Sequence, residues 1–323
     1  MAVYTEVTDE ALRAFLSEYA IGALVAFRGI AEGVENSNYA LKTDAGDFIL
    51  TLYERRVDPE ELPYFLGLMD HMAARGLSCP VPVKGRDGRA LRELAERPAA
   101  ICTFLPGVWP RRVRVEHCGP LGDALAAMHD AAADFPMRRP NTLGPAGWAP
   151  LLDRCRGGAE PVPGLIAELD AALAAILSDW PSALPLGQIH ADLFPDNVFF
   201  MGANGGPPVV SGLIDFYFAC TDLLAYDVAV CLNAWCFEPD LAFNVTKARA
   251  LLGAYRARRP LTQAEIAALP VLCRGAAIRF ALTRLFDWAN TPAGALVTRK
   301  DPMEYVRRLR FHLAATGPEA YGI

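Results

Sequence analysis

The segment Gln188–Phe200 constrains this chain more than any other stretch of its sequence. It contains His190, Asp192 and Asn197 in the spacing H-x-D-L-x-x-x-N. This spacing is typical of the catalytic loop of phosphotransferases, in which the aspartate meets the accepting hydroxyl group and the asparagine binds a metal ion. An apolar run that ends at Asp215 follows it, where such an enzyme needs a second magnesium ligand. Because the two motifs occur in this order and spacing, together they predict a kinase.

Each residue of these motifs has a catalytic and a structural interpretation. We expect Asp192 to orient the attacking hydroxyl group and accept its proton; the alternative is that it only begins a turn. We expect Asn197 and Asp215 to bind magnesium through oxygen atoms; the alternatives are a strand cap and a turn former. His190 and Asp227 both have apolar neighbours in the sequence. We therefore expect these two residues to hold the loop in place rather than to act on a substrate.

The segment Gly29–Tyr39 lies where a kinase has the hairpin that covers the phosphates of its nucleotide. It lacks a G-x-G-x-x-G run, and the chain contains no G-x-x-x-x-G-K-[ST] motif, so it is not a P-loop protein. Glycine lets the backbone approach phosphates, and asparagine and serine supply donors. The predicted nucleotide contacts are Gly33, Asn36, Ser37 and Asn38 in this segment, with Lys42 and Thr103 on later strands. A plain β-turn would give the same sequence signal.

The charge and the apolar pattern argue against two kinds of partner. The formal net charge is -6 and only four lysines are present, so the clustered cations that a nucleic acid requires are missing. No apolar run approaches the ~20 residues of a membrane span, and the first residues do not form a signal peptide. The eight cysteines are dispersed without a C-x-x-C pair. We therefore expect a cytoplasmic protein with reduced thiols, no nucleic-acid partner and no membrane partner.

The patterning of the chain changes near residue 105. Before it, the sequence predicts a helix at 8–20 with Thr8 as its N-cap, and hairpin strands at 39–42 and 48–53. It also predicts a helix from about 58 and strands near 89–95 and 99–105. After it, helices are expected near 115–134, 163–180, 222–236, 243–258, 262–290 and 302–314, with strands at 198–201 and 209–214. We predict a bilobal α+β fold. Residues 1–105 form a small antiparallel-sheet lobe that binds nucleotide, and residues 106–323 form a mostly helical lobe with the catalytic and substrate sites.

Several blocks of the sequence carry a family resemblance. The catalytic loop, Asp215 with its flanking residues and the segment around Asp227 resemble the aminoglycoside phosphotransferase and choline kinase group, which has a protein-kinase-like fold. Within that group the chain resembles the homoserine kinase family. The blocks that carry this resemblance are Gly29–Leu41, Phe48–Arg56, Arg97–Ile101, His190–Phe200 and Gly212–Cys220. The resemblance implies ATP and magnesium as cofactors, and transfer of the γ-phosphoryl group to the side-chain hydroxyl of L-homoserine.

One position departs from the general kinase pattern. The third strand of the small lobe normally carries a lysine that contacts the α- and β-phosphates, and Thr51 stands at the position that we align with it. Threonine cannot supply that charge. Lys42 on the neighbouring strand, or Arg55 just beyond, are the candidates to replace it.

An amino-acid substrate would bring a carboxylate, which arginine binds well. Arg274, Arg279 and Arg284 lie on one predicted helix, and we predict Arg279 and Arg284 as contacts of the substrate. The alternative is that these arginines belong to a solvated helix face.

Other functions remain open at this stage. A related kinase would act on choline, methylthioribose or an aminoglycoside. The cationic groups of choline and of aminoglycosides call for acidic or aromatic walls. A non-catalytic binding protein with a kinase fold would explain the missing lysine but not the intact set of Asp192, Asn197 and Asp215. A metal hydrolase built on His190 would need more histidine ligands than the five scattered histidines offer.

Overall fold

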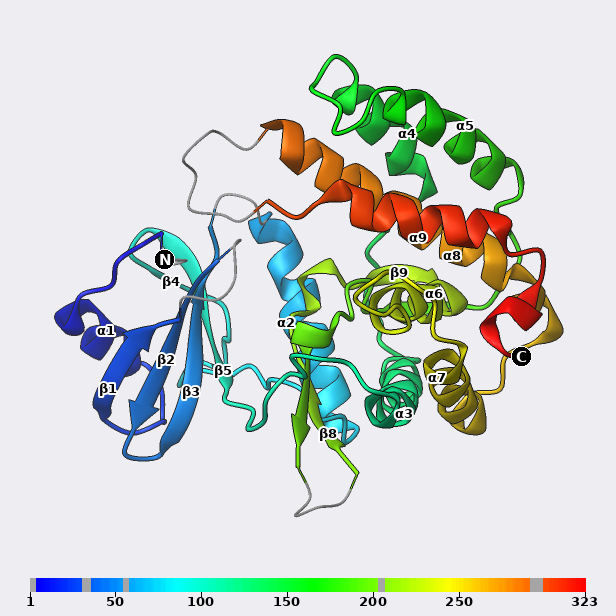
Figure 1. Ribbon diagram of the computed structural model, residues 1–323. Coiled ribbons are helices and arrows are strands. Elements are labelled where there is room, and N and C mark those ends of the chain that lie inside the picture. The colour runs from blue at the N-terminus through cyan, green and yellow to red at the C-terminus, as the bar shows by residue number, and fades with distance from the viewer. Residues whose placement is uncertain (1–3, 31–35, 55–57, 203–206, 291–298) are drawn as a thin grey trace. The chain divides into compact units, whose positions relative to one another are not determined.

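The computed structural model describes residues 4–30, 36–54, 58–202, 207–290 and 299–323 (Figure 1). The chain divides into two compact units, Met1–Gly107 with Ser211–Tyr217, and Val108–Val210 with Phe218–Ile323. The first contains a five-stranded antiparallel sheet, and the second is mainly helical. The predicted α+β class is therefore confirmed.

The sheet of the first unit has the strand order β1-β2-β3-β5-β4. Its strands are β1 (Leu24–Gly29), β2 (Ser37–Thr43), β3 (Gly46–Leu52), β4 (Arg92–Leu94) and β5 (Arg97–Thr103). The hairpin of β2 and β3 confirms the prediction, and its register places Asn38 opposite Thr51 and Lys42 opposite Asp47. Alternate side chains of a strand point to opposite faces of a sheet. Asn38 and Thr51 therefore share the face that is not turned to the main core.

That core lies between the sheet and helix α1 (Asp9–Leu16). Thr8 caps the helix as the sequence predicts, because its side chain accepts a hydrogen bond from the backbone N–H of Ala11. The apolar stripe of α1 packs on the alternating buried residues of β2 and β3, and the cluster includes Leu12, Phe15, Leu16, Tyr39, Leu41, Leu50 and Leu52. A 3-10 turn (Pro59–Glu61) leads into α2 (Leu62–Ala74).

Residues Ser211–Tyr217 belong to the first unit, although the sequence analysis placed them with residues 106–323. Three hydrogen bonds attach this segment to the sheet unit. The backbone N–H of Leu213 donates to the Ser78 carbonyl at 3.0 Å, and the Ser211 hydroxyl donates to the Pro106 carbonyl at 2.6 Å. The hydroxyl groups of Tyr217 and Tyr53 lie 2.9 Å apart. These contacts are long-range in sequence, which is why periodicity did not predict them.

The second unit is built from seven helices within the described residues. They are α3 (Val115–Ala131), α4 (Pro145–Cys155), α5 (Leu165–Ser178), α6 (Leu224–Trp235), α7 (Val245–Arg258), α8 (Gln263–Asn290) and α9 (Pro302–Ala314). This unit also contains a small sheet that pairs β6 (Leu186–Ile189) with β9 (Cys220–Leu223), and strand β7 (Val198–Met201). Strand β8 (Val209–Leu213) begins in this unit and ends in the first one. A final 3-10 turn spans Pro318–Tyr321. Helix α4 and strands β6 and β9 were not predicted.

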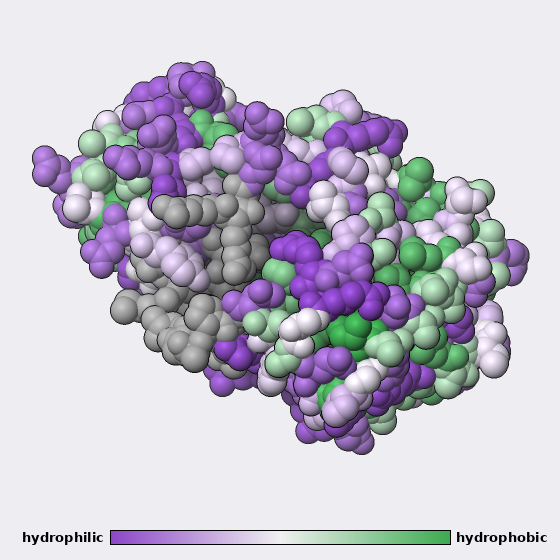
Figure 2. Space-filling view, turned by 90° about the horizontal axis from the view of Figure 1, so that it is seen from above, coloured by the Kyte–Doolittle hydropathy of each residue, from purple (hydrophilic) through white to green (hydrophobic). Residues whose placement is uncertain are grey.

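Helix α8 is the central helix of the second unit. It packs against α4, α5, α6 and α9, and α9 runs beside it in Figure 1. Its length and composition would allow it to cross a membrane, but 72% of its most apolar window is buried inside the protein. A core helix of a globular protein has this character. On the face seen in Figure 2, hydrophilic and hydrophobic residues are interspersed.

Candidate functional site

The catalytic-loop motif forms a tight turn between β6 and β7. The turn follows Ile189 and passes through Ala191, which has a left-handed backbone with φ of 62°. The backbone N–H of Asp192 donates to Nδ1 of His190 at 3.3 Å, and the N–H of Phe194 donates to the Asp192 carbonyl at 2.8 Å. His190 is fully buried, whereas the side chain of Asp192 is 21% exposed. The turn therefore buries His190, which supports its backbone, and leaves the carboxylate of Asp192 accessible.

Asp227 holds the backbone of this turn from the first turn of α6. One carboxylate oxygen accepts from the N–H of His190 at 2.7 Å, and the other accepts from the N–H of Ala191 at 2.9 Å. His129 on α3 adds a contact to the same carboxylate at 3.1 Å. The structure confirms that Asp227 anchors the loop.

The environment of Asp227 favours its ionised form. Burial alone raises the pKa of a carboxyl group, but the hydrogen bond from His129 and the charges of His129 and His190 outweigh it. The pKa of Asp227 therefore lies below its usual value. Because the carboxylate is fully buried, its charge is compensated entirely by these partners.

A chain of polar groups continues outward from Asp227. Nδ1 of His129 lies 2.8 Å from the hydroxyl of Tyr255, which accepts a hydrogen bond from Arg259 at 3.2 Å. Arg259 also pairs with Glu265 at 2.8 Å. Sequence reasoning missed His129, because it lies 98 residues before Asp227 and outside any motif.

Asn197 lies in a 3-10 turn at the end of the motif and is buried. Its side-chain nitrogen donates to the Asp192 carbonyl at 2.8 Å. This bond fixes the orientation of the amide, so the side-chain oxygen is the atom left for a metal ion. The arrangement fits a hard cation such as magnesium, which prefers oxygen ligands. Asn197 thus also ties the two ends of the motif together.

Two tertiary contacts fix the middle of the loop. Nε1 of Trp235 donates to the Leu193 carbonyl at 2.8 Å. The ring of Phe194 packs on Phe280 with ring centroids 4.9 Å apart. The loop is therefore held by helices α6 and α8 as well as by its own hydrogen bonds.

The two arginines predicted as substrate contacts have different surroundings. Arg279 is 1% exposed, donates to the Ala191 carbonyl and lies 3.8 Å from the carboxylate of Asp192. Arg284 pairs with Glu304 at 2.6 Å, and its side chain is 11% exposed. Arg274, on the same helix, donates to backbone carbonyls at the end of α9. The structure therefore brings Arg279, but not Arg274, to the catalytic loop.

Asp215, the second predicted metal ligand, lies in the first unit and is exposed. It follows β8 and has a left-handed backbone with φ of 64°. Two residues further on, Tyr217 contacts Tyr53 through its hydroxyl and packs its ring on Phe65. Burial raises the pKa of both tyrosines, so their hydroxyl groups stay protonated near neutral pH. The aromatic cluster anchors the turn that presents Asp215.

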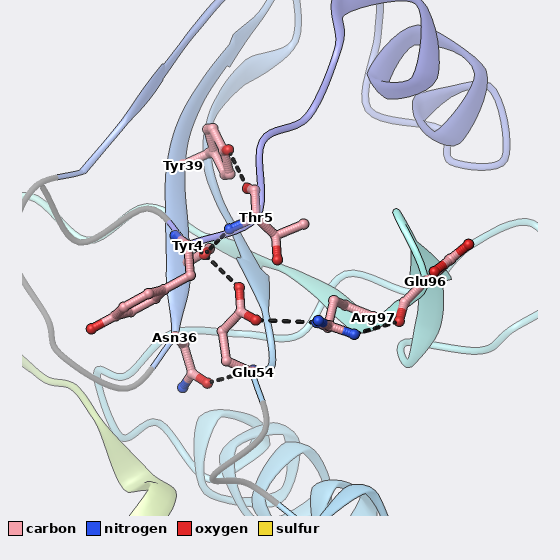
Figure 3. A network of polar contacts seen from close by, with 8 residues as sticks. Tyr4, Thr5, Asn36, Tyr39, Glu54, Glu96 and Arg97 are labelled. Atoms are coloured by element: carbon pink, nitrogen blue, oxygen red, sulfur yellow. Dashed lines mark hydrogen bonds and ion pairs between the residues drawn. The ribbon is translucent and has the colours of Figure 1, made fainter.

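The predicted nucleotide contacts Asn36 and Ser37 belong to a polar network around Glu54. Figure 3 shows Asn36, Glu54 and Arg97 of this network. The side-chain oxygen of Asn36 accepts from the N–H of Glu54 at 3.2 Å, and the Ser37 hydroxyl donates to Glu54 at 2.7 Å. Arg97 completes the network with a 3.1 Å contact to Glu54. Ser37 is fully buried, so its hydroxyl does not reach a surface where it could meet a phosphate.

The remaining predicted nucleotide contacts are spread over the sheet. Asn38 is half-buried, and its side-chain oxygen accepts a hydrogen bond from the Thr51 hydroxyl at 2.8 Å. Lys42 lies at the other end of β2, exposed and opposite Asp47. The Thr103 hydroxyl at the end of β5 accepts from the N–H of Val81 at 3.0 Å. Gly33 and Arg55 lie outside the described residues.

Comparisons with known proteins agree with this geometry. A model of the family described as "Phosphotransferase enzyme family" matches residues 26–261. The chain therefore belongs to the phosphotransferase enzymes.

The relatives narrow this class further. The chain is 67% identical to a homoserine kinase of Granulibacter bethesdensis and 67% identical to one of Acidiphilium cryptum, in each case over the full length of both proteins. Within the phosphotransferase family it thus groups with the homoserine kinases, and the resemblance seen in the sequence is confirmed.

Solved structures show the same fold at low sequence identity. An amicoumacin kinase aligns with a TM-score of 0.70 at 13% identity, covering 96% of this chain and 94% of that one. A choline kinase from Cryptosporidium parvum aligns with a TM-score of 0.65 at 12% identity, covering 95% of this chain and 94% of that one. The predicted protein-kinase-like fold is therefore confirmed.

The role of Asp227 predicts a combined loss of stability and activity. Asp227→Asn removes a buried negative charge beside His129 and replaces one acceptor oxygen by a donor facing a backbone N–H. We expect the free energy of unfolding to fall by about 3–5 kcal/mol, as when a buried pair loses one partner. Urea titration measures this loss, and kcat should fall with it.

The exposed pair of Asp123 and Arg258 provides the control, since Asp123→Asn should lower the free energy of unfolding by at most about 1 kcal/mol. Equal stability of the two variants would contradict the anchoring role.

Proposed function

We propose that this protein transfers the γ-phosphoryl group of ATP to the side-chain hydroxyl of L-homoserine and so forms O-phospho-L-homoserine. The observation that carries the proposal is identity of 67% over the full length with proteins named homoserine kinase. Short motifs alone would support only the kinase class, because many related kinases share them. The proposal includes a role in threonine biosynthesis and a cytoplasmic location. The burial of all eight unpaired cysteines fits this location.

Asp192 is the proposed catalytic base. Its carboxylate is partly exposed, while the backbone around it is fixed by Asp227 and Asn197. Phosphoryl transfer needs little covalent work from the protein and depends on placing the hydroxyl in line with the phosphorus atom. A carboxylate on a rigid turn can accept the hydroxyl proton and hold the oxygen in that position.

Asn197 and Asp215 are the proposed magnesium ligands. Each offers an oxygen atom: Asn197 through an amide oriented by its bond to Asp192, and Asp215 through an exposed carboxylate. Magnesium usually takes only one or two protein ligands and completes its shell with phosphate oxygens and water. When bound, it would neutralise charge on the transferring phosphoryl group.

Asn38 is the proposed substitute for the missing lysine. Thr51, at the position aligned with that lysine, donates its proton to the side-chain oxygen of Asn38. The side-chain nitrogen of Asn38 therefore remains as a donor on the sheet face opposite the core. A neutral donor oriented in this way can bind a phosphate oxygen. Lys42 is a weaker candidate, because it lies four positions further along the extended strand than Asn38.

The first prediction concerns the base. Asp192→Asn keeps the size of the side chain but cannot accept the hydroxyl proton, so kcat should fall by about 10²–10⁴-fold. The dissociation constant of ATP with magnesium, measured by calorimetry, should stay within about twofold, because the substitution leaves the nucleotide contacts in place. Asp196, exposed in the same loop, gives the control, and Asp196→Asn should keep kcat within about threefold. A fully active Asp192→Asn enzyme would refute the assignment.

The second prediction concerns the phosphate contact. Asn38→Ala should raise KM for ATP by about tenfold, the effect of one hydrogen bond to a charged group. Thr51→Val should raise KM for ATP by a smaller factor, because the substitution removes only the hydrogen bond that orients the Asn38 amide. Lys42→Met should change it by less than about twofold, or roughly 0.4 kcal/mol. Steady-state ADP release at saturating homoserine measures all three. The reverse order, with Lys42→Met the most damaging, would return the phosphate contact to Lys42.

The third prediction concerns the substrate. L-homoserine should be phosphorylated far better than choline, methylthioribose or kanamycin. L-serine is one methylene shorter, so its hydroxyl should fall short of Asp192 once the amino-acid head group is anchored. Arg284 remains a proposed contact for the substrate carboxylate, and Arg284→Met should then raise KM for homoserine and leave that for ATP unchanged. An ADP-release assay with a panel of these compounds measures the turnover of each one. Faster turnover of another panel member than of homoserine would overturn the substrate and leave the kinase class standing.

A further inference from the structure

We propose that Arg279 is a positioning residue that clamps the catalytic loop from the side opposite to Asp227, rather than a contact of the substrate. The proposal builds on the function given above, since it concerns the loop that carries Asp192. The observation that carries it is the pair of bonds at one residue, Ala191. Its N–H donates to Asp227 and its carbonyl accepts from Arg279.

Ala191 needs such a clamp because of its backbone conformation. Its φ of 62° lies in the left-handed region, which is unfavourable for a residue with a side chain and persists only where the surroundings enforce it. Asp227 reaches the turn from α6, and Arg279 reaches it from α8. An anion thus holds the N–H side of Ala191 and a cation holds its carbonyl side. Asp192 is the next residue, so the direction of its side chain depends on this conformation.

The surroundings of Arg279 argue against a direct contact with substrate. Its side chain is 2% exposed, compared with 21% for Asp192. The ring of Phe280 lies 4.4 Å from the guanidinium carbon, and the ring of Phe218 lies 5.7 Å from it. Rings on its faces and a carbonyl at one nitrogen leave little room for a second carboxylate. The other terminal nitrogen lies 3.8 Å from the carboxylate of Asp192.

The same geometry explains why arginine stands here. The guanidinium is a rigid fork that can donate to the Ala191 carbonyl through one nitrogen and face Asp192 with the other. A lysine would keep the positive charge but has a single nitrogen, so it cannot serve both groups with the same geometry. Arg279→Lys is therefore the informative variant: it retains the charge in the buried site and removes the fork.

The experiment compares Arg279→Lys with Arg274→Lys. Arg274 is a matched control, because it lies on the same helix and also donates to backbone carbonyls, but at the end of α9. For Arg279→Lys we expect kcat to fall by about 10²-fold, the size of effect that a small displacement of a catalytic group produces. The dissociation constant of homoserine should stay within about threefold. For Arg274→Lys both quantities should stay within about twofold.

A second measurement needs no substrate. Hydrogen–deuterium exchange of the peptide covering His190–Asn197 should become faster in Arg279→Lys, while peptides of α6 and α8 keep their protection. Should wild type fail to phosphorylate homoserine, the proposed substrate would be wrong, but this comparison would still test the clamp. Arg279→Met is a further variant, for which we also expect faster exchange of the loop peptide and unchanged protection of α6 and α8. If Arg279→Met does not fold, Arg279→Lys alone tests the clamp.

Two results would overturn the proposal. The first is a rise of tenfold or more in the homoserine dissociation constant while kcat at saturation is preserved, because Arg279 would then touch the substrate. The second is unchanged exchange of the loop in Arg279→Lys, because the loop would then not depend on the fork.

Discussion

The carboxylate of Asp227 is the interaction on which the catalytic half of this structure depends. It is fully buried and binds two consecutive backbone N–H groups of the loop that carries Asp192. A buried charge is tolerated only when its partners compensate it, so Asp227 and the loop stabilise each other. The left-handed conformation of Ala191 and the partial exposure of Asp192 follow from this arrangement.

The two units contribute different kinds of groups to the proposed chemistry. In the second unit, helices α6 and α8 contact the loop backbone through Asp227, Trp235 and Arg279, and this preorganises the loop that carries Asp192, the proposed base. In the first unit, Thr51, at the position that we align with the lysine of many kinases, is hydrogen-bonded to Asn38. The charge of the phosphates would then be met by magnesium and by oriented hydrogen bonds rather than by a nearby cation.

The sequence predicted those features that local patterns encode. The motif at His190–Asn197, the hairpin of β2 and β3 and the cap at Thr8 depend on spacing and residue type, and each is present. Helix α4 was missed because it contains Pro150, which is unfavourable inside a helix. The membership of Ser211–Tyr217 in the first unit and the burial of Arg279 depend on contacts between residues far apart in sequence. The sequence places Arg274, Arg279 and Arg284 on one helix but gives no sign that Arg279 alone meets the Ala191 carbonyl.

The central claim is that the side-chain hydroxyl of homoserine receives the phosphoryl group. Phosphorus NMR of a reaction with magnesium, ATP and L-homoserine tests this most directly, because it identifies the accepting atom as well as the turnover. The account predicts a phosphomonoester signal split by the two protons of the adjacent methylene group, formed in step with ADP. Release of inorganic phosphate without that ester, or a signal from phosphate on the carboxylate or the amino group, would contradict it.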